Sequence, residues 1–197
     1  DELTIHYGLI PRTNRGIFCI NELPDLSERI QVGLFNIMEE RDVQIKGYRI
    51  RLPLDVFLVA SANPEDYTNR GRIITPLKDR YGAQIRTHYP LVPEHEIRIM
   101  EQEHKPFNQS GYQTYVPQFI KDVLAEFSAL ARRSPDVSQR SGVSVRVSIG
   151  NYETIIGNAL RRAILLKETD VTPRISDLPY ILTSTLGRIE LESLDEG

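Results

Sequence analysis

Three short polar segments of the sequence combine a carboxylate, amides and a guanidinium, which are side-chain types that bind ligands and move protons. Asn21 and Glu22 follow one short apolar run, Asn63 follows a second, and Arg80 lies further along the chain. Ligands of open parallel sheets bind beyond the carboxyl ends of the strands. The order and spacing of these residues therefore predict a ligand site at the strand ends.

Each of these residues also has an ordinary explanation when it is considered alone. Glu22 could be a solvated cap after a strand, and Asn63 before Pro64 is a common turn former. Arg80 follows Asp79 and could form a surface ion pair of little energetic consequence. Only the combination of the segments favours a site over these alternatives.

Hydrophobic patterning predicts the elements that position these residues. Short continuous apolar runs are typical of buried parallel strands, and apolar residues three to four apart indicate helices. These patterns predict a strand at 17–20, a helix after Asp25 with Glu28 as its capping-box partner, a hairpin over 43–52, and strands at 56–60 and 85–89. This order predicts an α/β fold with a parallel-sheet core.

The second half of the chain has a helical pattern. A helix is expected from Pro93 to Glu103, and the composition then shifts to Pro, Asn, Gln, Ser and Gly. We therefore expect the α/β domain at 1–104 and a small all-α domain at 105–197. Its helices are expected at 116–131, 145–167 and 175–186.

Composition restricts the class of protein. A net charge of −3 argues against a dedicated nucleic-acid binder, which usually carries a basic excess. No apolar stretch approaches the roughly 20 residues that span a bilayer, and the first residues do not form a signal peptide. The single cysteine, Cys19, is expected to be a small buried residue and cannot form a disulfide framework, which indicates a reducing cytoplasm.

Several segments together resemble AAA+ ATPases of the magnesium-chelatase and MoxR type. Gly8-Leu9-Ile10 and the stretch from Asn14 to Glu22 are similar to the approach to the Walker B strand of that family. The stretch from Val56 to Pro64 resembles its sensor-1 strand, and the stretch from Leu77 to Gly82 resembles its arginine-finger segment. Ser144-Val145-Arg146 is similar to a sensor-2 arginine at the start of a lid helix.

The resemblance implies a role for each polar residue. Glu22 would be the general base that polarises the attacking water, and Asn63 would hold that water or a γ-phosphate oxygen. Arg80 would reach the nucleotide of a neighbouring subunit, where such an arginine contributes on the order of 10³–10⁵ in rate. Arg146 would contact phosphate from the lid. Asn21 would help to hold Mg²⁺ through water, so the implied cofactors are ATP and Mg²⁺.

Two departures from the family pattern limit this resemblance. The sequence contains no Gly-x-x-x-x-Gly-Lys-Ser/Thr loop, which supplies the phosphate cradle and its lysine. The missing loop is expected before Asp1, so the chain alone is expected to be inactive. The acidic pair of Walker B is represented by Asn21-Glu22, and an asparagine lacks the charge with which the usual aspartate attracts Mg²⁺.

The expected function is that of a cytoplasmic ATP-driven remodelling subunit that forms a ring, with six as the expected number of subunits. Its client would be a protein partner or a metal-insertion complex. The alternative is a non-hydrolysing scaffold module with the AAA+ shape. A bacterial enhancer-binding transcription activator ranks lower, because the Gly-Ala-Phe-Thr-Gly-Ala contact loop of that family is absent and no DNA-binding domain follows.

The predicted hairpin carries a basic group that has two interpretations. Arg41, Lys46, Arg49 and Arg51 outnumber Asp42 there. They could form a solvated face, or a surface toward a central pore, as a hairpin at this place does in the resembled family. The four histidines show no spacing typical of a zinc site.

Overall fold

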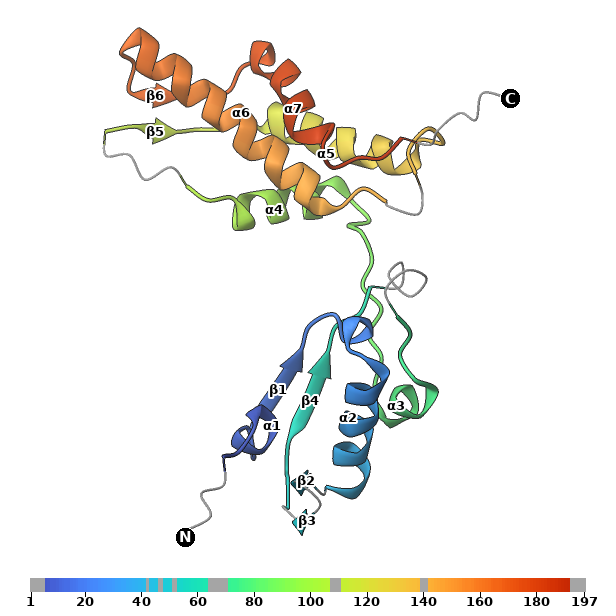
Figure 1. Ribbon diagram of the computed structural model, residues 1–197. Helices are drawn as coiled ribbons and strands as arrows, with labels where there is room; N and C mark the ends of the chain where they lie inside the picture. The colour runs from blue at the N-terminus through green and yellow to red at the C-terminus, as the bar shows by residue number, and fades with distance from the viewer. Residues whose placement is uncertain are drawn as a thin grey trace. The chain divides into compact units, whose positions relative to one another are not determined.

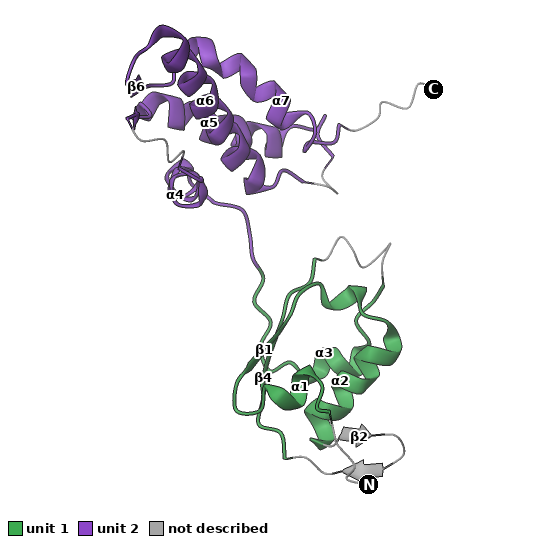
Figure 2. Cartoon of the chain, turned by 60° about the vertical axis from the view of Figure 1, so that its left-hand side comes forward, with its two compact units in different colours: residues 1–86 green, residues 87–197 purple. Residues whose placement is uncertain are grey.

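The computed structural model divides the chain into two compact units, residues 1–86 and 87–197 (Figure 2). The residues whose structure is described are 6–41, 43–45, 48–50, 53–63, 71–106, 111–138 and 142–191. Within these residues, no helix is long and apolar enough to cross a membrane. The fold is α/β in the first unit and mainly helical in the second, in agreement with the sequence prediction.

The first unit is built on a parallel pair of strands with helices beside it (Figure 1). Its elements are α1 (Leu9–Arg12), β1 (Ile17–Ile20), the 3₁₀ helix η1 (Leu23–Asp25), α2 (Glu28–Glu40), β2 (Val43–Ile45), β3 (Tyr48–Ile50), β4 (Phe57–Ala60) and α3 (Thr75–Arg80). The predicted strands at 17–20 and 56–60 are confirmed as β1 and β4.

One face of the β1–β4 pair carries the core of the first unit. Ile20, Leu23, Leu34 and Leu77 are buried there, with partly buried apolar side chains from both strands around them. The opposite face is open among the described residues, where Ile17 and Phe57 are 64% and 69% exposed. The expectation of fully buried strands was therefore wrong for this face.

Cys19 illustrates the same difference. The sequence predicts a buried cysteine, yet Cys19 is exposed, because its side chain lies on the open face of β1. Side chains alternate between the two faces of a strand, so burial on one face does not extend to the next residue.

The predicted hairpin is present as β2 and β3. The two strands pair antiparallel, with Val43 opposite Ile50 and Ile45 opposite Tyr48. Whether the basic residues there form a solvated or a functional surface depends on side chains that the structure does not describe. The exception is exposed Arg41, which caps the C-terminal end of α2.

Two local predictions in the first unit were wrong. Asp25 does not cap α2, because Pro24 and Asp25 form η1 and the helix begins after Ser27, which makes no side-chain capping bond. The segment 85–89 is not a strand, and Ile85 is 91% exposed. A strand needs a neighbour with which to pair, and none of the described strands pairs with this segment.

The second unit is a helical assembly with one very small parallel strand pair. Its elements are α4 (Pro93–Glu103), β5 (Gln113–Thr114), α5 (Gln118–Arg133), α6 (Val145–Leu166), β6 (Asp170–Val171), the 3₁₀ helix η3 (Ile175–Tyr180) and α7 (Ile181–Thr185). The long helix α6 contributes Ile155, Ile156 and Ala159 to a core that also contains Ile120 and Leu124 of α5. The predicted helices at 93–103 and 145–167 match α4 and α6 closely.

The boundary between the units lies at residues 86 and 87, whereas the sequence predicts it between residues 104 and 105. Helix α4 accounts for the difference, because Ile97 and Met100 are buried in the core of the second unit. The compositional shift after residue 104 marks a connection within this unit.

A buried charged pair also attaches α4 to the second unit. Both Oε atoms of Glu96 accept hydrogen bonds of 2.8 Å from Arg132 of α5, and Glu96 is only 2% exposed. The hydroxyl of Ser148 on α6 donates to the same carboxylate. Arg132 also donates to the backbone oxygen of Val143 at 3.0 Å and lies over the ring of Tyr89 at 4.6 Å. The Glu96–Arg132 pair and its further contacts thus join α4, α5 and α6 to one another and to Tyr89 near the start of the second unit.

Breaking this pair should destabilise the second unit strongly. We expect Glu96→Gln or Arg132→Met to lower its free energy of unfolding by about 3–5 kcal/mol, because the remaining partner stays buried without its counter-charge. Urea unfolding followed by the helical circular-dichroism signal measures the loss.

The matched control is the pair Arg133–Glu126, which is exposed and joins residues of α5 alone. Glu126→Gln should change the stability by about 0.5 kcal/mol or less. Equal effects at the buried and exposed pairs would contradict the assignment of α4 to the second unit through Glu96.

Candidate functional site at the ends of two parallel strands

The parallel pairing of β1 and β4 brings two of the predicted polar segments to the same edge. Ile20 lies opposite Ala60, so the residues that follow the two strands emerge side by side. Asn21 and Glu22 follow β1, and Asn63 lies three residues beyond the end of β4. The expectation that these side chains share one end of a parallel sheet agrees with this geometry.

Asn21 is bound to a residue that the sequence analysis did not single out. The hydroxyl of Ser61, the first residue after β4, lies 2.6 Å from Oδ1 of Asn21. Both residues are exposed. Only the strand register places Ser61 beside Asn21, since the two are 40 positions apart in the chain.

Glu22 adopts an unusual backbone conformation. Its φ and ψ angles of 53° and 56° lie in the left-handed region, which non-glycine residues seldom occupy. Its N–H donates to Oγ of Ser61 at 3.2 Å, and the following N–H of Leu23 donates to the backbone oxygen of Ser61 at 2.9 Å. The carboxylate is half-buried and makes no hydrogen bond or ion pair with any described residue. It is therefore available to accept a proton.

Asn63 is exposed and lies at the end of the described part of this segment. It is engaged in an interaction with another part of the chain. Its place beyond β4 is compatible with the predicted role of holding a water or a phosphate oxygen, which stays a prediction.

Arg80 is the last residue of α3 and is held by α2 of the same unit. Its guanidinium pairs with the carboxylate of Glu39 and lies 5.5 Å from the ring centre of Phe35. The next residue, Tyr81, has a buried hydroxyl, and this burial raises the pKa of the phenol. Since exposed ion pairs contribute little, Arg80 can leave Glu39 at small cost.

Arg146 belongs to the second unit, whereas the strand ends belong to the first. It lies in the first turn of α6, where its backbone N–H donates to the side chain of Ser144 at 3.2 Å. Its backbone oxygen accepts from Arg188 at 2.7 Å. The Arg146 side chain is exposed, and its predicted contact with phosphate stays a prediction.

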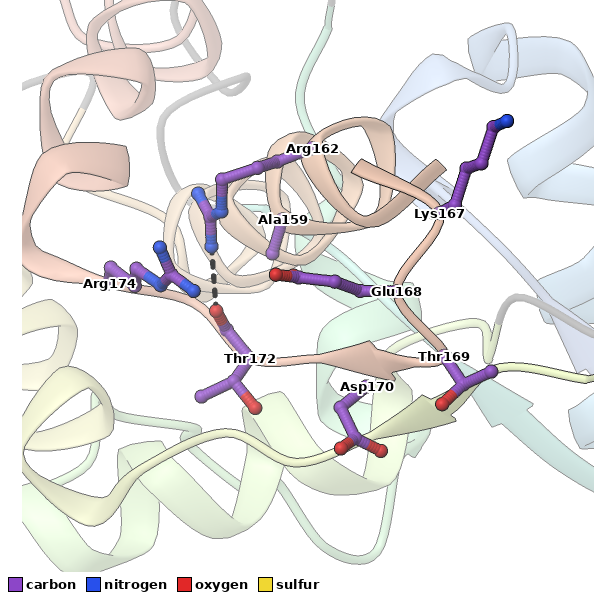
Figure 3. A pocket seen from close by; sticks show the side chains of 8 residues that line it. All are labelled: Ala159, Arg162, Lys167, Glu168, Thr169, Asp170, Thr172 and Arg174. Carbon is purple, nitrogen blue, oxygen red and sulfur yellow. Dashed lines mark hydrogen bonds between the residues drawn. The ribbon is translucent and has the colours of Figure 1, made fainter. Parts of the chain in front are cut away.

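The second unit also contains a polar cavity that the sequence analysis missed (Figure 3). It has a volume of about 440 Å³ and lies at the C-terminal end of α6, the opposite end from Arg146. In its wall, the guanidinium of Arg162 donates to the backbone oxygen of Thr172 at 2.7 Å. The cavity is lined by Ala159, Arg162, Lys167, Glu168, Thr169, Asp170, Thr172 and Arg174. Its lining carries charges of both signs, positive at Arg162, Lys167 and Arg174 and negative at Glu168 and Asp170.

The described residues include no group of three or more histidine, cysteine, aspartate or glutamate side chains that could hold a metal ion. At the strand ends, Asn21 offers an uncharged oxygen that already accepts from Ser61, and Glu22 is the one carboxylate beside it.

Comparisons with known proteins agree with a nucleotide-related fold for the first unit. Residues 3–78 match the family model of the sigma-54 interaction domain, an ATPase domain of the AAA+ type. This range includes Asn21, Glu22 and Asn63 and ends before Arg80. The comparisons support AAA+ ATPase character for this region, and the magnesium-chelatase and MoxR subtype stays a prediction.

A crystal structure of a protein from Cytophaga hutchinsonii that is assigned as an ATPase is also similar to the chain. The two are 17% identical, with a TM-score of 0.37 over 90% of this chain. The chain spans 59% of the length of that structure. No curated protein sequence matches the chain.

Asp177, which binds the cavity-lining residues Arg162 and Arg174, makes stability depend on pH. Asp177, which is 1% exposed, accepts from Asn158 at 2.6 Å, from Arg162 at 2.5 Å and from the backbone N–H of Arg174 at 2.7 Å. Burial alone would raise the pKa of Asp177, but these hydrogen bonds outweigh burial and lower it. Ionised Asp177 therefore stabilises the second unit above the ordinary aspartate pKa of about 4, and this contribution is lost as the pH falls through the lowered value.

We expect Asp177→Asn to be less stable than the parent at neutral pH and to lose less stability on acidification. Urea unfolding at a series of pH values between neutral and acid measures both effects. Asp122→Asn, which changes an exposed carboxylate on α5, is the control and should keep the parent acid dependence. A parental acid dependence in Asp177→Asn would contradict the lowered pKa of Asp177.

Proposed function

We propose that this chain is part of an ATP-hydrolysing AAA+ remodelling subunit that resembles the magnesium-chelatase and MoxR ATPases. In this proposal, hydrolysis in a ring of subunits drives action on a protein partner or a metal-insertion complex. The observation that supports the proposal is that Asn21 and Glu22 follow β1 and Asn63 follows β4 at the same end of a parallel strand pair, within the region that matches an AAA+-type family model.

Glu22 has the properties required of a general base. Its carboxylate is half-buried and makes no hydrogen bond or ion pair with any described residue, and its backbone is fixed by two hydrogen bonds from residues 22 and 23 to Ser61. A carboxylate on such a fixed backbone can hold a water and take its proton as the water attacks phosphorus. Asn63 would orient the same water or an adjacent phosphate oxygen from the end of β4.

Glu22 and Asn63 have the side chains needed to position and deprotonate the attacking water. The sequence does not supply the loop that binds the phosphates of ATP. The 197 residues contain no glycine-rich phosphate loop, so the cradle and its lysine would come from residues outside this sequence. Asn21 fits poorly as a magnesium ligand, since magnesium sites normally use one or two carboxylates. When bound, Mg²⁺ would neutralise phosphate charge, while the roles of Glu22 and Asn63 rest on their own side chains.

Two alternatives have specific observations in their favour. The absence of a carboxylate at Asn21 and of a phosphate loop favours a scaffold with AAA+ shape that does not hydrolyse ATP. The match of residues 3–78 to a sigma-54 interaction domain favours a transcription activator, although the Gly-Ala-Phe-Thr-Gly-Ala contact loop is absent from the sequence. Specific binding of sigma-54 by the purified protein would favour the activator over the remodelling subunit.

The ion pair between Arg80 and Glu39 provides a test of the arginine-finger role. In the full-length protein, Arg80→Ala should lower ATP turnover by about 10³-fold or more, because a trans arginine stabilises the charge of the transition state. Nucleotide affinity should change little, since Arg80 would act on a neighbouring subunit's nucleotide. Steady-state ATPase assays and nucleotide titration measure the two quantities.

Glu39→Gln is the matched control, because it removes the partner of Arg80 within the same chain and leaves the guanidinium. Turnover of Glu39→Gln should stay within a few-fold of the parent. A loss of turnover equal to that of Arg80→Ala would show that Arg80 acts through α2 of its own subunit, and would contradict the finger assignment.

A further inference from the structure

Ser61 joins the ends of β1 and β4 through both its backbone and its side chain. Its N–H donates to the backbone oxygen of Ile20 at 2.9 Å, and its backbone oxygen accepts from Leu23 at 2.9 Å. The hydroxyl lies between Asn21 and Glu22, at 2.6 Å from Oδ1 of the first and 3.2 Å from the backbone nitrogen of the second. One residue thus contacts the whole segment 20–23.

The direction of these hydrogen bonds follows from the donor inventory. The N–H of Glu22 can only donate, so Oγ of Ser61 accepts from it and uses its one proton toward Asn21. If the Asn21 amide were reversed, Oγ would accept twice and the hydroxyl proton would have no acceptor among the described residues. Oδ1 of Asn21 is therefore the atom bound to Ser61. The N–H₂ group of Asn21 keeps both of its donors for another partner.

The conformation of Glu22 needs a restraint of this kind. The left-handed region costs a non-glycine residue about 1–2 kcal/mol. Arg15, Arg41 and Lys167 also have positive φ angles. Arg41 and Lys167 are helix C-caps, where this conformation is common, and Arg15 lies in the turn before β1, where its N–H donates to the backbone oxygen of Asp55 at 2.6 Å. Glu22 lies directly after a strand, and the bonds to Ser61 hold it there. Strain that is held by neighbouring bonds is typical of residues with a function.

We propose that Ser61 is a positioning residue, which fixes the direction of the Glu22 carboxylate and turns the N–H₂ donors of Asn21 toward the ligand. Asn21 then donates to an anionic oxygen, such as a phosphate oxygen, and does not serve as a metal ligand. This inference rests on the proposed ATP hydrolysis for its effect on turnover, while its effect on the backbone requires no nucleotide.

The first arm of the test measures amide hydrogen exchange by NMR in the 197-residue chain. Ser61→Ala should make exchange of the Glu22 amide about fivefold faster, because one net hydrogen bond of about 1 kcal/mol is lost. The Leu23 amide, which bonds to the backbone oxygen of Ser61, should change much less and reports on any general loss of structure. Ser61→Thr keeps the hydroxyl and should retain the parent protection.

The second arm measures ATP turnover of the full-length protein. Ser61→Ala should lower kcat by at least tenfold with KM within about twofold, and Ser61→Thr should restore most of kcat. Ser27→Ala is the matched control, because the Ser27 side chain makes no capping hydrogen bond, and it should match the parent in both arms.

Faster Glu22 exchange together with a kcat loss that threonine rescues supports the proposal. Unchanged Glu22 exchange in Ser61→Ala would overturn it, as would faster exchange with parental kcat, which would leave Ser61 a purely structural role. A parent protein without ATP turnover would refute the proposed function itself, and this is seen before any substitution is made.

Discussion

The register of the parallel β1–β4 pair is the constraint on which the candidate site depends. Parallel strands cannot be joined by a tight turn, so the chain must cross over, and here the crossover contains α2 and the β2–β3 hairpin. The crossover buries one face of the pair and returns β4 with Ala60 opposite Ile20. A shift of the register by one residue would separate Ser61 from Asn21 and leave Glu22 without its restraint.

The second unit depends on a different kind of interaction. Its apolar core is formed mainly by α5 and α6, and the buried Glu96–Arg132 pair joins α4 to both helices. A buried ion pair contributes modest net stability, but its geometry is specific, because each charge accepts only one arrangement of partners. Each unit therefore has its own core and its own polar anchor.

The sequence predicted those features that depend on local pattern. The strands β1 and β4, the β2–β3 hairpin and the helices α4 and α6 follow from apolar runs, alternation and periodicity. The prediction of a strand at 85–89 was wrong because a local sequence pattern does not reveal whether a partner strand exists. The predicted position of the domain boundary differs from the observed one because Glu96 is buried, whereas in the sequence it resembles a residue on a solvated helix face.

The same distinction applies to the site. Asn21 and Glu22 were identifiable because they directly follow an apolar run, and Asn63 because it precedes Pro64 shortly after a second run. Ser61 was not, because its importance depends on the strand register, and neither was the partner of Arg80, because Glu39 is brought to it by packing of α3 on α2. The left-handed backbone of Glu22 could not be predicted either, because a glutamate in the sequence does not indicate a positive φ angle.

The most direct test of the account is single-turnover hydrolysis of bound ATP by the full-length protein with Glu22→Gln. Glutamine keeps the size and polarity of the side chain but cannot accept the proton of the attacking water. The account predicts parental ATP affinity and hydrolysis that is slower by about 10²–10⁴-fold, the range typical of a general base. Hydrolysis at the parental rate would contradict the assignment of catalysis to the ends of β1 and β4.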